Sequence, residues 1–145
     1  MARDWESYRR DFIVHLTDYT YSLLRAVENI ESPIERIAVV ETIKFRDVYG
    51  SANFSVSSHT PVGKYEADIV IRNKSIKVAI ECDGHEFHEK TKEQAAKDKK
   101  RDREFQKEGY VILRYTGSEI CNTPKTITDD LKKIFNVDVV TTEEG

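Results

Sequence analysis

The amino-acid sequence predicts one α/β domain, in which a mixed β-sheet is flanked by helices and an extra helix lies at the N-terminus. Helical spacing of apolar residues occupies the first third of the chain, and two segments of alternating residues then form a hairpin. A helical segment separates this hairpin from one further apolar strand, which implies a right-handed crossover into a parallel neighbour. The 145 residues suit one hydrophobic core, so residues 1–145 are expected to form a single domain.

The N-terminal helix is predicted within residues 1–30, with its regular part from Trp5 to about Glu28. Its apolar residues recur at steps of three and four positions and form one stripe: Trp5, Tyr8, Phe12, Leu16, Tyr19, Leu23 and Val27. We expect this stripe to pack on the chain's own core. The spacing is also heptad-like, so the alternative is a partner surface, for a homodimer or for another protein.

A second helix is predicted to begin at Ser32 and to end near Phe45. Ser32 can cap the helix, Pro33 suits its first position, and Glu35 would complete a capping box. Glu41 lies near the centre of an apolar face of this helix, whose other members are Ile34, Ile37, Ala38 and Phe45.

The remaining elements follow in order: strands at Asn53–Ser58, Lys64–Arg72 and Lys77–Asp83, a helix from His88 to Glu108, a strand at Tyr110–Tyr115 and a helix from about Pro124 to Phe135. Gly109 marks the end of the long helix. The nearly unbroken apolar run of the last strand predicts burial on both faces. The core would thus span residues 32–120, with a C-terminal helix within 121–137 and a loose tail at 138–145.

Composition narrows the class of protein. The net charge of −3 argues against a wholly basic nucleic-acid coat, although a local basic face remains compatible with it. Cys82 and Cys121 form no paired motif, so we expect free thiols and a cytoplasmic protein. No apolar run is long enough for a transmembrane helix, and no secretion signal is recognisable, so a membrane partner is not expected.

Two predicted strands carry acidic residues that alternation places on one face. Glu81 and Asp83 share a face of the second strand of the hairpin, opposite to Val78, Ile80 and Cys82. On the first strand, Asp68 shares a face with Glu66 and Val70, opposite to Ala67, Ile69 and Ile71. Pairing Asp68 with Glu81, or a slip of two residues, keeps the apolar rows together and clusters the carboxylates.

Clustered carboxylates repel one another and raise each other's pKa, which a bound cation would relieve. Oxygen ligands from Asp and Glu suit Mg²⁺ or Mn²⁺. Such an ion can bind phosphate oxygens and lower the pKa of an attacking water, so phosphodiester hydrolysis is the natural chemistry. The alternative is that Glu66 and Asp83 lie at strand ends in solvent and bind nothing; Asp68 and Glu81 are surrounded by apolar strand residues.

These residues resemble the PD-(D/E)XK, or restriction-endonuclease-like, nuclease superfamily, and in particular its small Vsr-like domains. The resemblance covers roughly Ser32 to Ile120 and rests on the order and spacing of several short segments. Their members are Ser32–Glu35, Val62–Asp68, Ala79–Gly84, the helical residues Asp98, Arg101, Asp102 and Phe105 with Gly109, and the strand Val111–Tyr115.

The resemblance implies an αβββαβ core and Mg²⁺-dependent cleavage of a phosphodiester, with DNA as the expected substrate. Asp68 and Glu81 would be metal ligands, the Cys82 carbonyl would add a third oxygen, and Glu35 would complete the shell directly or through water.

The chain departs from the family pattern at the motif's lysine, because Asp83 stands two residues after Glu81 where that lysine is expected. Asp83, His85 or His88 would then orient or deprotonate the attacking water. His59 stands where related domains often carry glutamine. Zinc is not expected at Cys82, Asp83, His85 and His88, because their spacing is not that of a common zinc site.

Four alternatives stay open, the first of which is a nuclease whose target is RNA or a branched structure. Helical geometry favours Glu41 as the acid aimed at the site, whereas family spacing favours Glu35. The basic helix at Lys90–Lys107 is either a phosphate-contacting face or an ordinary solvated helix, with Asp98 and Arg101 as a brace behind the site. The same fold without its lysine could also be an inactive module that binds nucleic acid or a protein.

Overall fold

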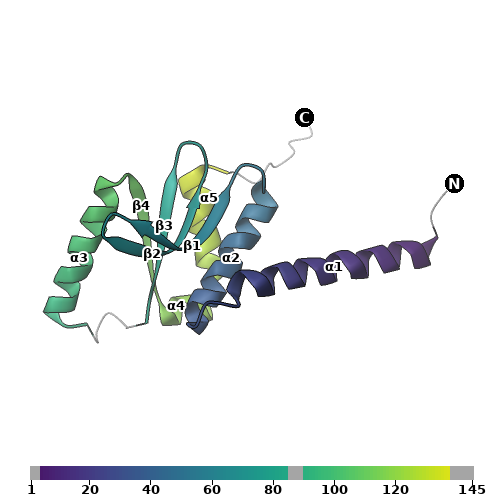
Figure 1. The fold of residues 1–145 in the computed structure, drawn as a ribbon, viewed down its shortest axis with the longest axis horizontal. Coiled ribbons are helices and arrows are strands. Elements are labelled where there is room, and N and C mark those ends of the chain that lie inside the picture. The colour runs from purple at the N-terminus through teal and green to yellow at the C-terminus, as the bar shows by residue number, and fades with distance from the viewer. Residues whose placement is uncertain (1–3, 85–89, 138–145) are drawn as a thin grey trace.

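The structure is a computed structural model that describes residues 4–84 and 90–137. Its helices and strands follow the predicted order (Figure 1). They are α1 (Trp5–Val27), α2 (Pro33–Tyr49), β1 (Ser55–Val62), β2 (Tyr65–Arg72), β3 (Lys77–Asp83), α3 (Lys92–Lys107), β4 (Tyr110–Thr116), α4 (Gly117–Asn122) and α5 (Lys125–Phe135).

The four strands form one mixed sheet in the order β1-β2-β3-β4. The pairs β1–β2 and β2–β3 are antiparallel, whereas β4 lies parallel to β3 after the crossover through α3. Helix α3 covers one face of the sheet, and α2 and α5 cover the other (Figure 1). The predicted α/β fold class, with a mixed sheet between helices and an additional N-terminal helix, is therefore confirmed.

The register of the central hairpin is the one that the apolar pattern predicts. Ile69 pairs with Ile80, and Ile71 pairs with Val78. These side chains join the large core under α2 and α5. Continuing the register by one residue brings Asp68 opposite Glu81, at the end of the hairpin nearest to the carboxyl end of β3.

A second, smaller core lies under α3. It contains Val70, Ala79 and Phe105 together with Val62 and Ala67. The prediction that Ala67 shares a face with Ile69 and Ile71 is wrong, because Ala67 packs in the α3 core. The backbone of His59, on the neighbouring strand, has a positive φ of 49°, which interrupts regular alternation at this level of the hairpin.

Several predicted boundaries shift for local reasons. Helix α2 continues past Phe45 to Tyr49 and ends at Gly50, whose φ is 129°. Strand β1 is Ser55–Val62 rather than Asn53–Ser58, because the hairpin turns tightly at Gly63, whose φ is 58°. Helix α3 begins at Lys92 rather than His88, with Thr91 and Gln94 forming a capping box. His88 itself lies outside the described residues.

Helix α4 was not predicted, although its sequence carries a start signal. The Thr116 hydroxyl accepts from the Glu119 N–H, and the Glu119 carboxylate accepts from the Thr116 N–H, which completes a capping box. The motif Thr-x-x-Glu is visible in the sequence. It directly follows a strand and opens only six helical residues, so apolar periodicity gave no sign of it.

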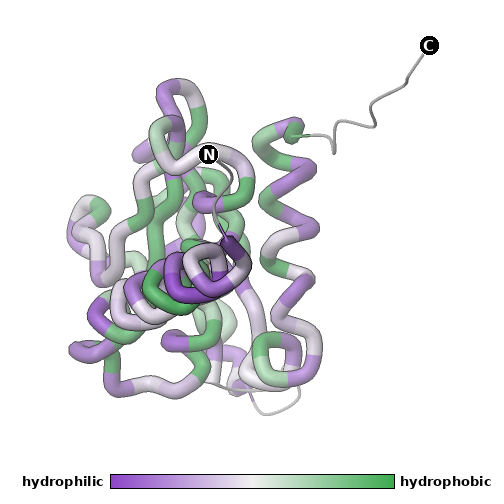
Figure 2. The backbone as a smooth tube through the Cα atoms, turned by 90° about the vertical axis from the view of Figure 1, so that its right-hand side faces the viewer, coloured by the Kyte–Doolittle hydropathy of each residue, from purple (hydrophilic) through white to green (hydrophobic). Residues whose placement is uncertain are grey.

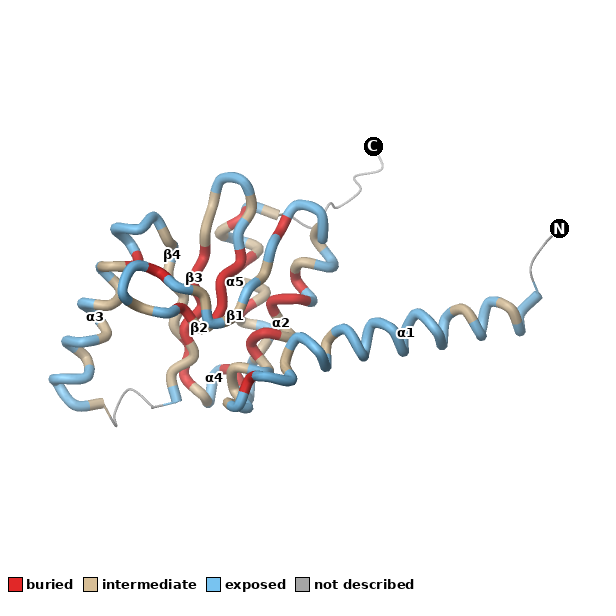
Figure 3. The backbone as a smooth tube through the Cα atoms, in the orientation of Figure 1, coloured by how far each residue is buried: buried red, intermediate tan, exposed pale blue. Residues whose placement is uncertain are grey.

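Helix α1 has the predicted limits but does not pack as expected. Only its last turns contact the core, through Leu23 and Val27. The rest projects from the body of the molecule, and most of it is exposed (Figures 1 and 3). Figure 2, which looks along α1 from its N-terminal end, shows hydrophobic and hydrophilic residues side by side on this helix. The expectation that its whole apolar stripe joins the chain's own core is therefore wrong.

Candidate active site

The candidate site forms where β2 begins and β3 ends. The Asp68 carboxylate accepts a hydrogen bond of 2.8 Å from the backbone N–H of Cys82 on the neighbouring strand. This bond orients Asp68 toward β3 and uses one of its oxygens. The negative charge of Asp68 lies close enough to raise the pKa of Glu81, so the two carboxylates form one electrostatic unit.

Glu81 is a buried acid with only one of its oxygens paired. Its side chain is 5% exposed, and Oε2 forms an ion pair of 3.1 Å with Arg101. Oε1 is buried and has no hydrogen-bond partner among the described residues. Burial, and then the charge of Asp68, raise the pKa of Glu81 to about 7. A buried acceptor without a partner is costly, so this oxygen is suited to a ligand that brings positive charge.

Glu35 lies on the first turn of α2 and faces the same end of the sheet. Its carboxylate lies 3.5 Å from Nε2 of His59, whose Nδ1 is 2.9 Å from Glu66. Burial, followed by the charge of Asp68, raises the pKa of Glu35. The Ser32 hydroxyl accepts from the Glu35 N–H at 3.4 Å, but the Glu35 carboxylate turns to His59, so the predicted capping box is only half formed.

Glu41 points to a different neighbour. Its carboxylate lies 3.0 Å from Lys44 and 3.4 Å from the Thr128 hydroxyl on α5. The structure therefore brings Glu35, and not Glu41, close to Asp68. Helical geometry alone could not separate the two acids, because it does not say which end of α2 meets the acidic end of the hairpin.

Asp83 is paired with a lysine from the start of α3. The Lys90 ammonium contacts the Asp83 carboxylate and lies 2.6 Å from Asp98. Lys90 and Asp83 are largely buried, with side chains 10% and 11% exposed, whereas Asp98 is 31% exposed. Sequence reasoning did not assign Lys90 to the site, since a lysine before a charged helix has no distinctive spacing. His85 and His88 lie outside the described residues, so their expected roles stay predictions.

The four acids of the predicted face, Glu66, Asp68, Glu81 and Asp83, do not form one cluster. Glu66 is 60% exposed and bound to His59, and Asp83 is held by Lys90. Within residues 4–84 and 90–137, no group of three or more His, Cys, Asp or Glu side chains is arranged to hold a metal ion. The prediction that all the acids cluster is therefore corrected: Asp68 and Glu81 remain together, with Glu35 beside them.

Two arginines brace the site from the α3 side. Arg101 reaches Glu81 and the backbone carbonyl of Glu66, and its guanidinium lies 5.4 Å from the Tyr65 ring and 5.3 Å from the Phe105 ring. Arg114 of β4 pairs with Asp102 at 2.7 Å. A brace exists as the sequence suggested, but Arg101 binds Glu81, whereas Asp98 lies near Lys90 and Arg114.

Cys82 contributes its backbone to the site and its side chain to the core. The thiol packs against the large core, and burial raises its pKa. Its N–H holds Asp68, as described above. A role for the Cys82 carbonyl as a metal ligand remains a prediction.

The donor set fits a hard divalent cation. Mg²⁺ is typically bound by one or two carboxylates, with water and substrate phosphate completing its shell. Asp68 and Glu81 supply two carboxylates, and the unpaired Oε1 of Glu81 is a buried oxygen able to accept such an ion. Arg101 holds the other oxygen of Glu81, so this acid would bind through one oxygen.

Comparison with known proteins places the chain in a family. The family model described as REase_MTES_1575 matches residues 38–134, which include Asp68, Glu81, Asp83 and the whole of α3, whereas α1 and Glu35 lie outside the match. No curated protein and no solved structure matches the chain. Across the part of the chain that the structure describes, no helix is both long and apolar enough to cross a bilayer. The match covers more than half of the sequence, so the chain belongs to the restriction-endonuclease-like family REase_MTES_1575.

Proposed function

We propose that the protein is a metal-dependent endonuclease of the PD-(D/E)XK type, close to the Vsr-like domains. It hydrolyses phosphodiester bonds, with DNA as the expected substrate and Mg²⁺ or Mn²⁺ as the cofactor. One observation carries this proposal: the buried Oε1 of Glu81 has no hydrogen-bond partner among the residues that the structure describes, and the charge of Asp68 acts on the same carboxyl group. Membership of a restriction-endonuclease-like family supports a nuclease in general.

Asp68 and Glu81 are the proposed metal ligands, with Glu35 as a neighbouring acid. A divalent cation bound there would bind phosphate oxygens and lower the pKa of a water molecule. The chain prepares the site by fixing both acids. The Cys82 N–H orients Asp68, and Arg101 holds one oxygen of Glu81. These contacts restrict the rotamers of both acids, so the second oxygen of Glu81 has a defined position.

We assign the charge of the missing motif lysine to Lys90. Asp83 occupies the motif position, and the Lys90 ammonium contacts its carboxylate, so a positive charge is returned to the end of β3. Asp98 holds the same ammonium from α3 and restricts its position. In this arrangement Asp83 positions Lys90, and Lys90 is the candidate group for orienting water or phosphate.

Cleavage assays test the proposal directly. Plasmid DNA, single-stranded DNA and RNA are each incubated with the protein in Mg²⁺, Mn²⁺ or EDTA. Asp68→Asn and Glu81→Gln keep the shape of the side chains and remove their charge, so we expect each to reduce metal-dependent cutting by at least about 100-fold. Glu28→Gln is the matched control, because it neutralises an exposed acid at the end of α1, a helix that contributes no residue to the site.

Calorimetric titration of Mg²⁺ and Mn²⁺ gives an independent readout. The wild type and Glu28→Gln should bind the ion, whereas Asp68→Asn and Glu81→Gln should bind it much more weakly. Failure of the wild type to cut any of the three substrates would contradict the enzymatic proposal. It would favour the inactive module that binds nucleic acid or a protein, for which the replaced lysine is the motivating observation.

A further inference from the structure

The exposed part of α1 carries a stripe of large apolar side chains, which we call the α1 stripe: Trp5, Tyr8, Phe12, Leu16 and Tyr19. Trp5 is 84% exposed and Phe12 is 66% exposed. The stripe continues the line of Leu23 and Val27, which pack on the core. The chain's own body covers only the C-terminal part of this line, up to Tyr19, which is 38% exposed and whose hydroxyl hydrogen-bonds to Asp47 of α2.

The spacing of the α1 stripe is symmetric about its centre. Its members follow one another at steps of three, four, four and three residues, with Phe12 in the middle. Two copies placed antiparallel with Phe12 against Phe12 would therefore match at every position. Trp5 would face Tyr19 of the second copy, and Tyr8 would face Leu16. Such self-matching is what a two-fold symmetric interface requires.

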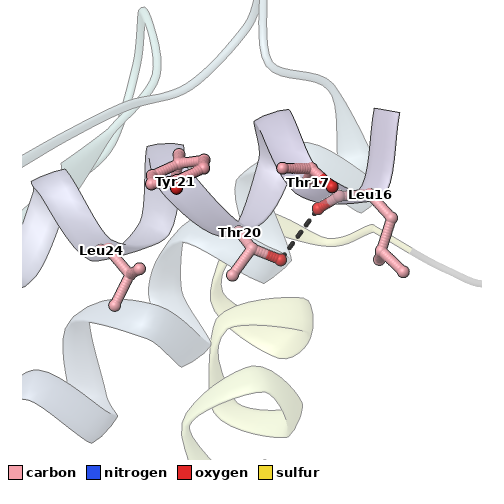
Figure 4. Close-up of a pocket in the computed structure, with 5 residues that line it drawn as sticks. All are labelled: Leu16, Thr17, Thr20, Tyr21 and Leu24. Carbon is pink, nitrogen blue, oxygen red and sulfur yellow. Dashed lines mark hydrogen bonds between the residues drawn. The ribbon is translucent and has the colours of Figure 1, made fainter. Parts of the chain in front are cut away.

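Two threonine hydroxyls of the exposed part of α1 are satisfied within the helix. The Thr17 hydroxyl donates to the carbonyl of Ile13, and the Thr20 hydroxyl donates to the carbonyl of Leu16, both at 2.8 Å. Figure 4 shows the second bond and the shallow hollow that Leu16, Thr20 and Leu24 line with their neighbours. Thr20, which flanks the stripe, can therefore border an apolar contact without leaving its hydroxyl group unpaired.

The area of the stripe suits a stable interface between two copies. Weighting about 150–250 Å² per aromatic side chain by the exposed fractions gives roughly 500 Å² for its four aromatic residues. Leu16 and the flanking Ile13, each more than half exposed, add to this area. The total approaches the ~800 Å² per partner of a standard interface.

The position of the body selects the antiparallel arrangement. Each globular body lies at the C-terminal end of its own α1 (Figure 1). Parallel helices would bring both bodies to the same end, where they would compete for space. Antiparallel helices place the bodies at opposite ends of the pair. We infer that the protein forms a homodimer through antiparallel pairing of the α1 stripe with that of a second copy, centred on Phe12.

Analytical ultracentrifugation of the full chain tests the dimer. The wild type is expected to sediment at twice its 16.8 kDa mass, in a concentration-dependent equilibrium. Phe12→Glu places two charges together at the centre, so we expect dimerisation to weaken by at least about 100-fold. Val14→Glu is the matched control, because Val14 is also exposed but lies on the opposite side of α1.

Circular dichroism establishes that both variants keep the helical content of the wild type. A wild type that stays monomeric at protein concentrations on the order of 100 micromolar would overturn the inference. So would a dimer that Phe12→Glu leaves intact. A monomeric wild type would instead indicate that the stripe binds another protein or a further segment of chain.

A distance measurement tests the orientation. Spin labels are attached at Ser22→Cys in a background that carries Cys82→Ala and Cys121→Ser. Antiparallel helices centred on Phe12 would separate the two labelled backbones by about 30 Å along the helix axis, from a rise of 1.5 Å per residue. Labels within about 15 Å of each other would indicate parallel helices and would overturn the proposed pairing. Neither experiment depends on cleavage, so the dimer and the nuclease proposal can fail separately.

Discussion

Glu81 is the residue on which the site depends most. It is an acid in a predominantly apolar strand, and only 4% of its surface is exposed. One of its oxygens is ion-paired to Arg101, and the other has no partner within residues 4–84 and 90–137. Burial and the charge of Asp68 destabilise the charged form of Glu81, and this raises its pKa. A charged carboxylate in this environment lowers the stability of the folded state, as is typical of functional sites.

The first prediction concerns the pH dependence of unfolding without divalent ions. The pKa of Glu81 is about 7 in the folded state, against the ordinary value of 4.5 that applies to the unfolded chain. The folded state thus binds more protons between these values. The stability that protonated Glu81 contributes is complete below about pH 4.5 and is lost as pH rises through 7, by about 3 kcal/mol in all.

Glu81→Gln imitates the protonated acid and should remove this loss. We expect the variant to be more stable than the wild type at pH 8 and close to it at pH 5, as measured by urea unfolding in EDTA. Glu28→Gln serves as the exposed control. An equal stability difference at both pH values would contradict the assignment of the titration to Glu81.

The second prediction at the residue scale concerns the contribution of Tyr115 to stability. It lies near the end of β4 and is 5% exposed, and its hydroxyl donates a 2.6 Å hydrogen bond to the Asp130 carboxylate on α5. Burial, and then this carboxylate, raise the pKa of Tyr115. Tyr115→Phe should lower the free energy of unfolding by about 2 kcal/mol, because a hydrogen bond to a charged group is lost. A double-mutant cycle with Asp130→Asn measures the coupling, and additive effects would contradict it.

At the scale of elements, α3 organises the site. Asp98, Arg101, Asp102 and Phe105 recur at helical spacing on its inner face. Phe105 is fully buried in the smaller core, and it also supports the Arg101 guanidinium. The capping box of Thr91 and Gln94 fixes where the helix begins, close to Lys90. Helix α3 therefore carries Arg101, the partner of Glu81, beside the Phe105 anchor, and its Asp98 holds Lys90, the partner of Asp83.

Removing that anchor should affect stability and the site together. Phe105→Ala is expected to lower the free energy of unfolding by about 3–5 kcal/mol, since it empties a buried ring. It should also loosen Arg101, which chemical shifts of its side chain can report. Val111→Ala, at an exposed position on β4, is the control and should cost less than about 1 kcal/mol. Equal losses in the two variants would contradict the anchoring role.

At the scale of the whole molecule, an acidic chain presents one basic helix face. The acids Asp98 and Asp102 turn inward to Lys90 and Arg114, while the outward residues of α3 are mostly basic. The exposed basic residues are Lys92, Lys97, Lys99, Lys100, Arg103 and Lys107. This separation gives a local positive surface on a chain whose net charge is −3, which suits a phosphate backbone.

The fourth prediction follows from this surface. Binding of a DNA duplex in EDTA, measured by fluorescence anisotropy, should weaken as salt concentration rises. Lys100→Ala should lower the slope of log affinity against log salt by about 0.9, the contribution of one phosphate contact. Lys74→Ala, in the exposed turn between β2 and β3, should leave the slope unchanged. A slope that both variants alter equally would contradict a binding face on α3.

Some features of the fold and of the site can be predicted from the sequence, and others cannot. Alternation in two strands was sufficient to predict the hairpin register, because a one-residue slip would bury polar rows and expose apolar ones. The pairing of Asp68 with Glu81 followed from that register. The short helix α4 was missed, because its six residues carry a cap but too few turns for a periodic signal.

The order of elements, the mixed sheet and the acidic pair were thus determined by the sequence itself, since they depend on local alternation and helical spacing. Tertiary structure decided the rest. It brought Glu35 rather than Glu41 to Asp68, placed Lys90 against Asp83, and left the α1 stripe outside the core. These outcomes depend on how elements dock across long stretches of chain, and the period of a helix or strand carries no information about which neighbour it will meet.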